Sequence, residues 1–278
     1  MVGKTNEIEH RVGVAKRLAT NIRAYLGELT SDQWELPSAC SEWRVRDVVS
    51  HLIGGAERQA ESMERGRRGD SNPPAGFSVL DAAELSAINA QRDIDRSIQL
   101  EGHSLESFDE SYGKLHQEFD QYHGDSWNIL AWHARRGAMP ASAYVELRIQ
   151  ELAIHDYDIR SSFQSDAGLD PDSVPILLDM TPRWLRMCFR PSDRLSRPVV
   201  YRFNAGSETY RMDATGDAFE MEAGDATQAD LSLSASVEDY LLFTYGRLSA
   251  VDGIASGKLI SIGDQIHLDQ FEVWFKGL

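Results

Sequence analysis

The sequence predicts an α+β protein of two domains, a helical bundle followed by a smaller domain of antiparallel sheet and helices. Apolar residues recur every three or four positions through most of residues 1–165, which is the period of amphipathic helices. After residue 197 the chain changes to short segments of alternating polarity, which are typical of strands. A chain of 278 residues also exceeds the usual size of one compact core. We therefore expect domains at residues 1–165 and 166–278.

The first domain is expected to contain helices over residues 8–26, 43–66, 79–100, 105–122 and 144–160. In the helix over 79–100, Leu80, Ile88 and Ile98 are among the apolar positions expected to face the core. The connection between the first two helices contains prolines and small polar residues, and we expect Trp34 and Trp43 within it to be buried. Residues 123–140 are too apolar for a simple linker and are expected to pack across the bundle mouth.

The second domain begins after a linker rich in turn residues at 165–174. A helix is expected over residues 175–190, followed by strands over 197–205, 208–214, 218–223 and 229–235, and the tight turns between them favour antiparallel pairing. Ser236 and Asp239 form a capping box at the start of a helix over 237–246. A last strand over 257–264 and a last helix over 269–277 complete the domain, with the sheet facing its helices.

Charge and composition limit the classes of partner. The chain has 44 acidic and 28 basic residues and a net charge of −16, which disfavours nucleic acid, anionic membranes and a regulatory role of the sigma or anti-sigma type. Because no apolar run has the length of a signal peptide or a membrane span, we expect a cytoplasmic protein. Cys40 and Cys188 form no CxxC pair, so a thiolate zinc site is not expected and any reactive thiol should come from outside.

The segment YVELRIQELAIHDYDIR at 144–160 places four polar residues at offsets of three, four and three. Arg148, Glu151, His155 and Asp158 should therefore lie on one face of a helix. Glu151 and His155 are one turn apart, from which both side chains can reach a single metal ion. The same pair could equally be two neighbours on a surface helix. A polar stripe beside apolar faces indicates a lined cavity.

Further histidines and acids are candidates for the same site. In the second helix, His51 shares a face with apolar residues and points inward, either as a ligand or as a core histidine. Asp47 precedes it by one turn and either supports it or complements the helix dipole. His133 could also be a ligand, but it has no partner at helical spacing. Asp158 is the stronger candidate for a carboxylate beside a metal-binding histidine.

Three motifs resemble the DinB-like four-helix metalloenzyme superfamily, in its mycothiol-dependent maleylpyruvate isomerase branch. They are PSACSEWRVRDVVSHL at 37–52, the third helix around Asn89, and RIQELAIHDYD at 148–158. The resemblance implies a metal on His51, Glu151 and His155. The second domain is similar to a sterol-carrier-like α+β domain through DLSLSASVEDYLLFTYGRL and GKLISIGD. Arg44 stands where relatives often have a capping Ser or Thr, and this departure leaves the substrate unspecified.

The resemblance implies a divalent metal, which this ligand set suggests is Zn²⁺, and mycothiol as the thiol cosubstrate. We expect an enzyme that activates mycothiol for attack on a small electrophilic metabolite, as a mycothiol S-transferase. One alternative is a mycothiol-dependent cis–trans isomerase of the maleylpyruvate type. Another is a non-enzymatic protein whose second domain binds an apolar small molecule. The sequence does not specify an oligomeric state.

Two arginines are candidates for contacts with anionic groups of the reactants. Arg247 lies at the end of the capped helix in the second domain, and Arg92 lies in the third helix. A guanidinium group matches a carboxylate with two parallel hydrogen bonds. Each residue also has a structural alternative, because arginines near a helix end complement the dipole and those within a helix pair with a neighbouring acid.

Overall fold

The computed structural model describes residues 2–40, 43–77 and 82–275, and the chain divides into two compact units, Met1–Ser173 and Val174–Leu278. The first unit is built mainly of helices, and the second combines a five-stranded sheet with helices. The predicted α+β organisation is therefore confirmed. The division falls after Ser173, near the end of the predicted linker, whereas the sequence analysis placed it after residue 165.

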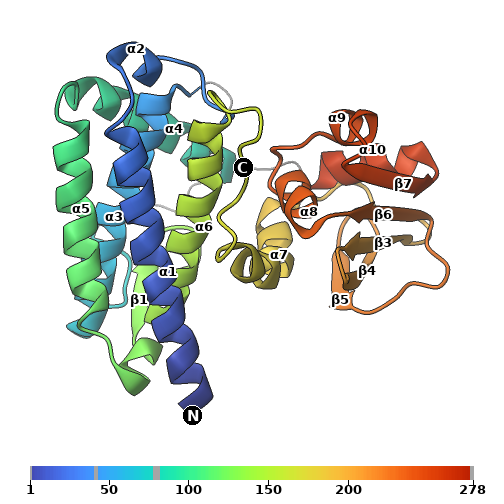
Figure 1. Cartoon of the computed structure of the whole chain (residues 1–278). Coiled ribbons are helices and arrows are strands. Elements are labelled where there is room, and N and C mark those ends of the chain that lie inside the picture. Colours follow the sequence, from blue (N-terminus) through green and yellow to red (C-terminus); the bar gives the residue numbers. More distant parts are fainter. Residues whose placement is uncertain (1, 41–42, 78–81, 276–278) are drawn as a thin grey trace. The chain divides into compact units, whose positions relative to one another are not determined.

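The first unit is a bundle of α1 (Val2–Leu26), α3 (Val45–Arg67), α5 (Ser104–Phe119) and α6 (Ala141–Arg160), shown in Figure 1. Helix α3 packs against α5, α6 and α4 (Ala82–Gln99), and α1 packs against α6 and α5. The short α2 (Ser31–Trp34) precedes α3. Apolar residues spaced by three and four, among them Leu18, Ile22, Val48, Leu52 and Leu152, are fully buried or nearly so. Their burial supplies the main driving force for this packing.

The connection between α5 and α6 folds into a short 3₁₀ turn, η1 (Gly124–Asn128), and a hairpin that the sequence analysis did not predict. Strands β1 (Leu130–His133) and β2 (Gly137–Pro140) pair antiparallel, and β1 packs against α3. The close approach requires a glycine on α3, since a Cβ atom at Gly66 would lie 2.6 Å from the Leu130 carbonyl oxygen. The hydroxyl of Tyr144 donates to the Trp132 carbonyl at 2.5 Å, which fixes the hairpin to α6.

Helix α4 presents a polar side to α3, contrary to the prediction that its apolar residues face the core. Ile88 and Ile98 are 53% and 56% exposed, while Asp93 and Ser97 are 0% and 4% exposed. The polar side is buried because α3 offers hydrogen-bonding partners for it, as described below. Leu80, which was also expected in the core, lies outside the described residues.

The second unit contains a sheet with strand order β5-β4-β3-β6-β7. Its elements are α7 (Val174–Cys188), β3 (Val199–Ala205), β4 (Glu208–Ala214), β5 (Phe219–Ala223), β6 (Leu231–Ala235), α8 (Val237–Thr244), α9 (Ala250–Ala255), β7 (Leu259–Gly263) and α10 (Gln265–Trp274). The predicted antiparallel pairing is confirmed for β3 with β4, β4 with β5 and β6 with β7, but it was wrong for β6 and β3, which pair parallel. The chain crosses from β5 at one edge to the far side of β3, and tight turns in a sequence predict only pairing between neighbours.

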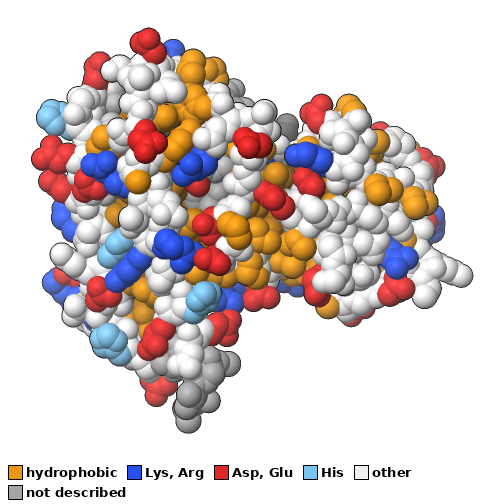
Figure 2. Space-filling view, viewed as in Figure 1, with side chains coloured by type: hydrophobic (Ala, Val, Ile, Leu, Met, Phe, Trp, Pro, Cys, Tyr) orange, Lys and Arg blue, Asp and Glu red, His pale blue; other side chains and the backbone are white. Residues whose placement is uncertain are grey.

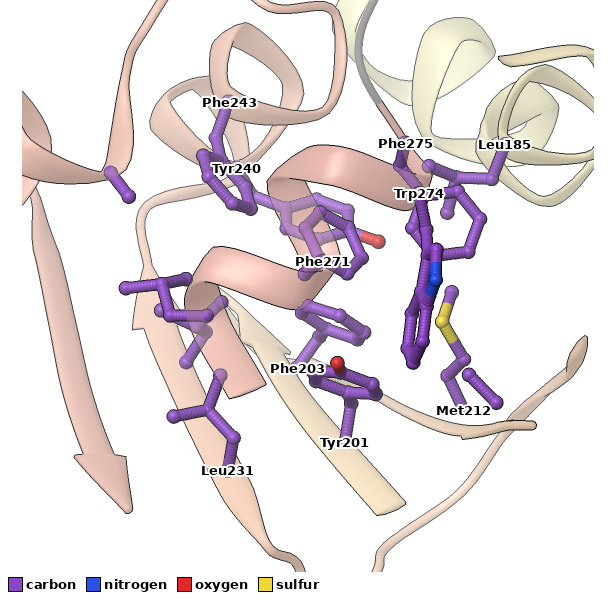
Figure 3. Close-up of a cluster of buried hydrophobic side chains, with 14 of the residues drawn as sticks. Leu185, Tyr201, Phe203, Met212, Leu231, Tyr240, Phe243, Phe271, Trp274 and Phe275 are labelled. Carbon is purple, nitrogen blue, oxygen red and sulfur yellow. The ribbon is translucent and has the colours of Figure 1, made fainter. Parts of the chain in front are cut away.

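Aromatic side chains fill the core between this sheet and its helices (Figure 3). Tyr201 and Phe203 come from β3, Tyr240 from α8, and Phe271 and Trp274 from α10, and each is at most 3% exposed. Rings of this size bury large apolar areas and pack edge to face or offset. The predicted cap at the start of α8 is confirmed, because the Ser236 hydroxyl accepts a hydrogen bond from the Asp239 backbone N–H at 3.0 Å.

Charged side chains are paired over much of the surface. Figure 2 shows basic groups interspersed among acidic ones on the visible face. Arg23 binds Asp109 at 2.8 Å and Lys16 binds Asp120 at 2.5 Å, and both pairs join α1 to α5 or its end. Exposed pairs of this kind contribute at most about 1 kcal/mol each.

Among the described residues, no helix combines the length and the apolarity that a membrane span needs.

Candidate metal centre

The three predicted ligands converge between α3 and α6. The His51 Nε2 atom lies 2.8 Å from Glu151 Oε2, and the His155 Nε2 atom lies 3.7 Å from the same oxygen. One potential ligand atom from each residue lies within 4.8 Å of the other two. The two imidazole rings meet edge to face with centroids 4.9 Å apart. Two nitrogens and one carboxylate oxygen thus face a common point, an arrangement that suits a divalent metal.

Each histidine is held by its own buried carboxylate. His155 Nδ1 lies 2.8 Å from Asp158 Oδ2, and His51 Nδ1 lies 2.9 Å from Asp93 Oδ2. Both aspartates are 0% exposed. Such carboxylates fix the tautomer and the ring orientation, so that Nε2 is the atom left to face the site. The predicted role of Asp158 beside His155 therefore matches its position.

The electrostatics prepare two of the three residues as ligands. Burial would raise the pKa of Glu151, but the hydrogen bond and charge of His51 together with His155 and Arg148 lower it. Burial also lowers the pKa of His155, and the hydrogen bond to Asp158 opposes this only in part. Burial would lower the pKa of His51, but its hydrogen bonds to Asp93 and Glu151 outweigh that effect and raise it. Because a metal binds only the unprotonated nitrogen, the raised pKa of His51 should make metal binding weaken as the pH falls.

Asp93 is the functional residue that the sequence analysis missed. We considered Asp47 as the carboxylate beside His51, but Asp47 accepts a hydrogen bond from the Arg44 backbone N–H at 2.9 Å and another from the Ser97 hydroxyl. It therefore caps the start of α3 and joins α3 to α4. The sequence does show an acidic residue at this position of the third helix. It was not predicted to lie near His51 because the apolar side of that helix was expected to face inward.

The loop before α3 covers one side of the centre. The Trp43 ring lies 5.0 Å from the His51 ring and 6.2 Å from the His155 ring, centroid to centroid. Trp43 and Trp34 are half-buried rather than buried as predicted. Cys40 in the same loop forms a second group of potential ligands with His155 and Asp158, which the sequence analysis did not predict. An indole against both rings limits the access of water to them.

Arg148 shares the stripe of Glu151 and His155, as predicted, and is only 2% exposed. Its Nε donates to the Gln59 side chain at 2.9 Å, and its Nη1 donates to the Tyr112 hydroxyl at 3.1 Å. A Cβ atom at Gly55 would lie 2.8 Å from Arg148 Nη2, so this position on α3 leaves room for the guanidinium group. Arg148 is therefore a bonded structural cation beside the centre.

The other predicted residues occupy different places. Arg92 is exposed on α4, and its Nε lies 3.4 Å from Oδ1 of Asp93, the next residue along the chain and the one that binds His51. Arg247, in the second unit, donates from Nη1 to the Tyr245 carbonyl at 2.9 Å. His133 lies on β1 outside the ligand group, and burial together with the positive charge of Arg136 lowers its pKa to about 4. The substrate contacts of Arg92 and Arg247 stay predictions.

One comparison with a solved structure covers most of the chain. The crystal structure of the mycothiol-dependent maleylpyruvate isomerase superposes with a TM-score of 0.64 and 14% identity over 91% of this chain and 92% of that chain, which shows a common fold. Sterol Carrier Protein 2 Like 2 from Aedes aegypti aligns with 36% of the chain at a TM-score of 0.28 and 15% identity.

Two uncharacterized proteins of Mycobacterium tuberculosis are 24% identical over 149 residues, which is 54% of this chain and only 65% of the length of each relative. The model of the family described as "Mycothiol maleylpyruvate isomerase N-terminal domain" matches residues 15–160. That match spans more than half of the chain and includes all three candidate ligands. The chain therefore belongs to the mycothiol maleylpyruvate isomerase N-terminal domain family.

Proposed function

We propose that this protein is a divalent-metal-dependent enzyme that activates mycothiol for reaction with a small electrophile. The observation that carries the proposal is the convergence of His51, Glu151 and His155, with a separate buried carboxylate behind each histidine. Membership of the family supports mycothiol as the thiol. The common fold over both units supports a reaction related to that of the solved isomerase.

The donor set fits a metal of the zinc type. Histidine nitrogens and a carboxylate oxygen are ligands of Zn²⁺, and three protein ligands are typical of catalytic sites that keep a position for an exchangeable group. His51, Glu151 and His155 would hold the ion. When bound, a divalent metal acts as a Lewis acid that lowers the pKa of a thiol, so that the nucleophilic thiolate predominates near neutral pH.

The residues of this chain contribute orientation, proton release and shielding. Asp93 and Asp158 hold the two imidazole rings in place through Nδ1. His51 must be unprotonated at Nε2 to bind a metal, and its raised pKa sets the acidic limit of that binding. Trp43 covers the imidazole rings with an apolar surface, which limits water around a reacting thiolate.

Two reactions follow from one activated thiol. In the first, the sulfur adds to an activated cis double bond, the resulting single bond rotates, and the sulfur leaves as the double bond re-forms, so that the electrophile is isomerised and the thiol is regenerated. In the second, the sulfur displaces a leaving group and the product is an S-conjugate. The fold match favours cis–trans isomerisation. S-transfer, which the sequence analysis favoured, is the second candidate because it needs the same thiolate.

A purely binding role is less well supported. That role would place an apolar ligand in the second unit, between the sheet and its helices. Large aromatic side chains from β3, α8 and α10 occupy this space and contact one another, with the Phe203 and Phe271 centroids 5.3 Å apart and those of Phe243 and Phe271 also 5.3 Å apart. Admitting a ligand would require these rings to move, at the cost of their packing.

The test combines metal content with product analysis. His51→Ala, Glu151→Ala and His155→Ala should each abolish stoichiometric metal binding in elemental analysis while circular dichroism stays unchanged. His103→Ala is the matched control, since the His103 side chain is 72% exposed and outside the centre. Wild-type protein is then incubated with mycothiol and either maleylpyruvate or chloroacetamide, and mass spectrometry and chromatography distinguish isomer from conjugate. If a variant keeps a full equivalent of metal, the residue replaced in it is not a metal ligand. If the metal-loaded wild type forms neither product, the proposed function is wrong.

A further inference from the structure

A group of arginines lies beside the candidate metal centre on α3, α4 and α6. Its members, here called the arginine cluster, are Arg58, Arg92, Arg96 and Arg148. Most of these cations have a partner. Arg96 Nη2 binds Glu57 at 2.6 Å, Arg92 lies 3.4 Å from a carboxylate oxygen of α4, and Arg148 makes the hydrogen bonds described above. Within the part of the chain that the structure describes, Arg58 forms neither a hydrogen bond nor an ion pair.

Two consecutive glycines on α3 allow these guanidinium groups to come together. A Cβ atom at Gly54 would lie 2.9 Å from Arg58 Nη1 and 3.2 Å from Arg96 Nη1. A Cβ atom at Gly55 would lie 2.8 Å from Arg148 Nη2. Glycine in a helix interior costs about 1 kcal/mol relative to alanine, so the pair is unfavourable for the helix itself. Its structural effect is to let the arginine side chains lie against the α3 backbone.

Arg58 lies on the same helix as the ligand His51, seven residues or two turns further along, which is about 10 Å along the axis. The charges of Asp93 and Glu151 act on it, as do those of Arg92 and Arg148. The side chain keeps access to solvent. Protein atoms packed around it and the charges of Arg92 and Arg148 nevertheless together lower the pKa of Arg58 to about 10. Arg58 therefore remains a cation at neutral pH, close to the centre and open to a ligand.

We propose that Arg58 binds a carboxylate group of the electrophilic substrate and so helps to position that substrate beside the metal centre. This inference rests on the proposed function. A carboxylate would supply the hydrogen-bond acceptor that Arg58 lacks and would offset the repulsion within the arginine cluster. The planar guanidinium fork matches a planar carboxylate. A phosphate dianion is less suitable, because Asp93 and Glu151 add two negative charges nearby.

The test measures equilibrium binding, so it does not depend on turnover. Metal-loaded full-length wild type, Arg58→Gln, Arg58→Lys and Arg68→Gln are titrated calorimetrically with maleate, with the neutral diamide of maleate and with inorganic phosphate. Arg68 is the matched control, because it is an exposed arginine at the end of the same helix with its side chain 70% exposed. Metal content and circular dichroism establish that each variant keeps its site and fold.

We expect Arg58→Gln to weaken maleate binding by about 10- to 150-fold, the range that corresponds to one charged hydrogen bond of about 1.5–3 kcal/mol. The maleate affinity of Arg58→Lys should lie between those of the wild type and Arg58→Gln, since lysine keeps the charge but lacks the two parallel N–H donors of the guanidinium group. Arg68→Gln should match the wild type, and the diamide should bind all four proteins alike. Equal maleate affinity in Arg58→Gln and wild type would overturn the inference. So would a wild type that binds no maleate at millimolar concentration or binds phosphate more tightly through Arg58.

The two proposals fail in different ways. If maleate binding depends on Arg58 but the wild type shows no turnover with mycothiol, the proposed enzymatic function is wrong and the carboxylate site stands. If the wild type turns over mycothiol with maleylpyruvate and Arg58→Gln keeps both the maleate affinity and the KM for maleylpyruvate, the carboxylate site is wrong and the enzyme stands.

Discussion

Replacement of Asp93 by asparagine tests whether the Asp93 carboxylate strengthens metal binding by His51. The change keeps the size and shape of the side chain and removes its charge. Asp93 is fully buried, and its Oδ2 lies 2.9 Å from His51 Nδ1. In the variant, the asparagine carbonyl can still accept a hydrogen bond from Nδ1, but it cannot balance the positive charge that develops on the ring. We expect the His51 ring to become a weaker metal ligand.

The expected magnitude follows from this single contact. Loss of the carboxylate behind a ligating histidine typically costs 10–100-fold in metal affinity, which is about 1.4–2.7 kcal/mol. Asp158→Asn should have a similar effect, because Asp158 supports His155 with the same geometry at 2.8 Å. The double variant should lose about the product of the two factors. Departure from that product measures the coupling between His51 and His155, whose ring centroids are 4.9 Å apart.

The assay is competition for Zn²⁺ against a chelator of known affinity, with Asp47→Asn as the matched control. Asp47 is another buried carboxylate between α3 and α4, 4% exposed, and it binds Ser97 and the Arg44 backbone rather than His51. Asp47→Asn should lower the free energy of unfolding without changing metal affinity. Wild-type metal affinity in Asp93→Asn, or an equal loss in Asp47→Asn, would refute the assignment.

Three further predictions address packing, pH and substrate contacts. Gly55→Val should place atoms where Arg148 Nη2 lies and lower the free energy of unfolding by about 1–3 kcal/mol in urea titrations; an unchanged midpoint would show that Arg148 can move aside. Burial lowers the pKa of His116 to about 4, so the unfolded state binds a proton that the folded state excludes. The free energy of unfolding of the wild type should therefore fall by at most about 3 kcal/mol between pH 6.5 and pH 4. The free energy of unfolding of His116→Gln should fall by less over that range. Equal decreases in the two proteins would show that His116 is not the group responsible. Arg92→Lys and Arg247→Lys should each raise a KM in assays with varied thiol and electrophile if they contact the reactants, and unchanged kinetics in both would place those contacts elsewhere.

The local part of the centre could be predicted from the sequence. Glu151, His155 and Asp158 lie on one helix, and helical geometry alone places residues separated by three or four on one face. Their meeting with His51 is different, because 100 residues separate His51 from Glu151 and no local rule brings them together. The resemblance to a known family supplied that step, and α3 packing against α6 accounts for it physically.

The long-range features of the second unit were harder to predict for a related reason. The strands and the Ser236 cap were recognisable because alternation and capping are local signals. The parallel pairing of β3 with β6 depends on where the chain goes after β5, and alternation is the same in parallel and antiparallel strands of a sheet with one solvent-facing side. Turn residues therefore predicted strand boundaries well and strand order poorly.

The inward polar side of α4 explains why Asp93 was missed and why it matters. A periodicity argument counts only apolar burial, which would turn Ile88 and Ile98 inward, yet both are more than half exposed. Burial of Asp93 would be costly alone, but the His51 ring provides a hydrogen-bonding partner at 2.9 Å, and leaving a buried polar group without its partner typically costs about 1–3 kcal/mol. The contact that orients a candidate metal ligand therefore also helps to fix α4 on α3. Asp93→Asn should consequently reduce metal affinity and the free energy of unfolding together, whereas Asp158→Asn, whose carboxylate lies on the same helix as His155, should affect the packing of α4 little.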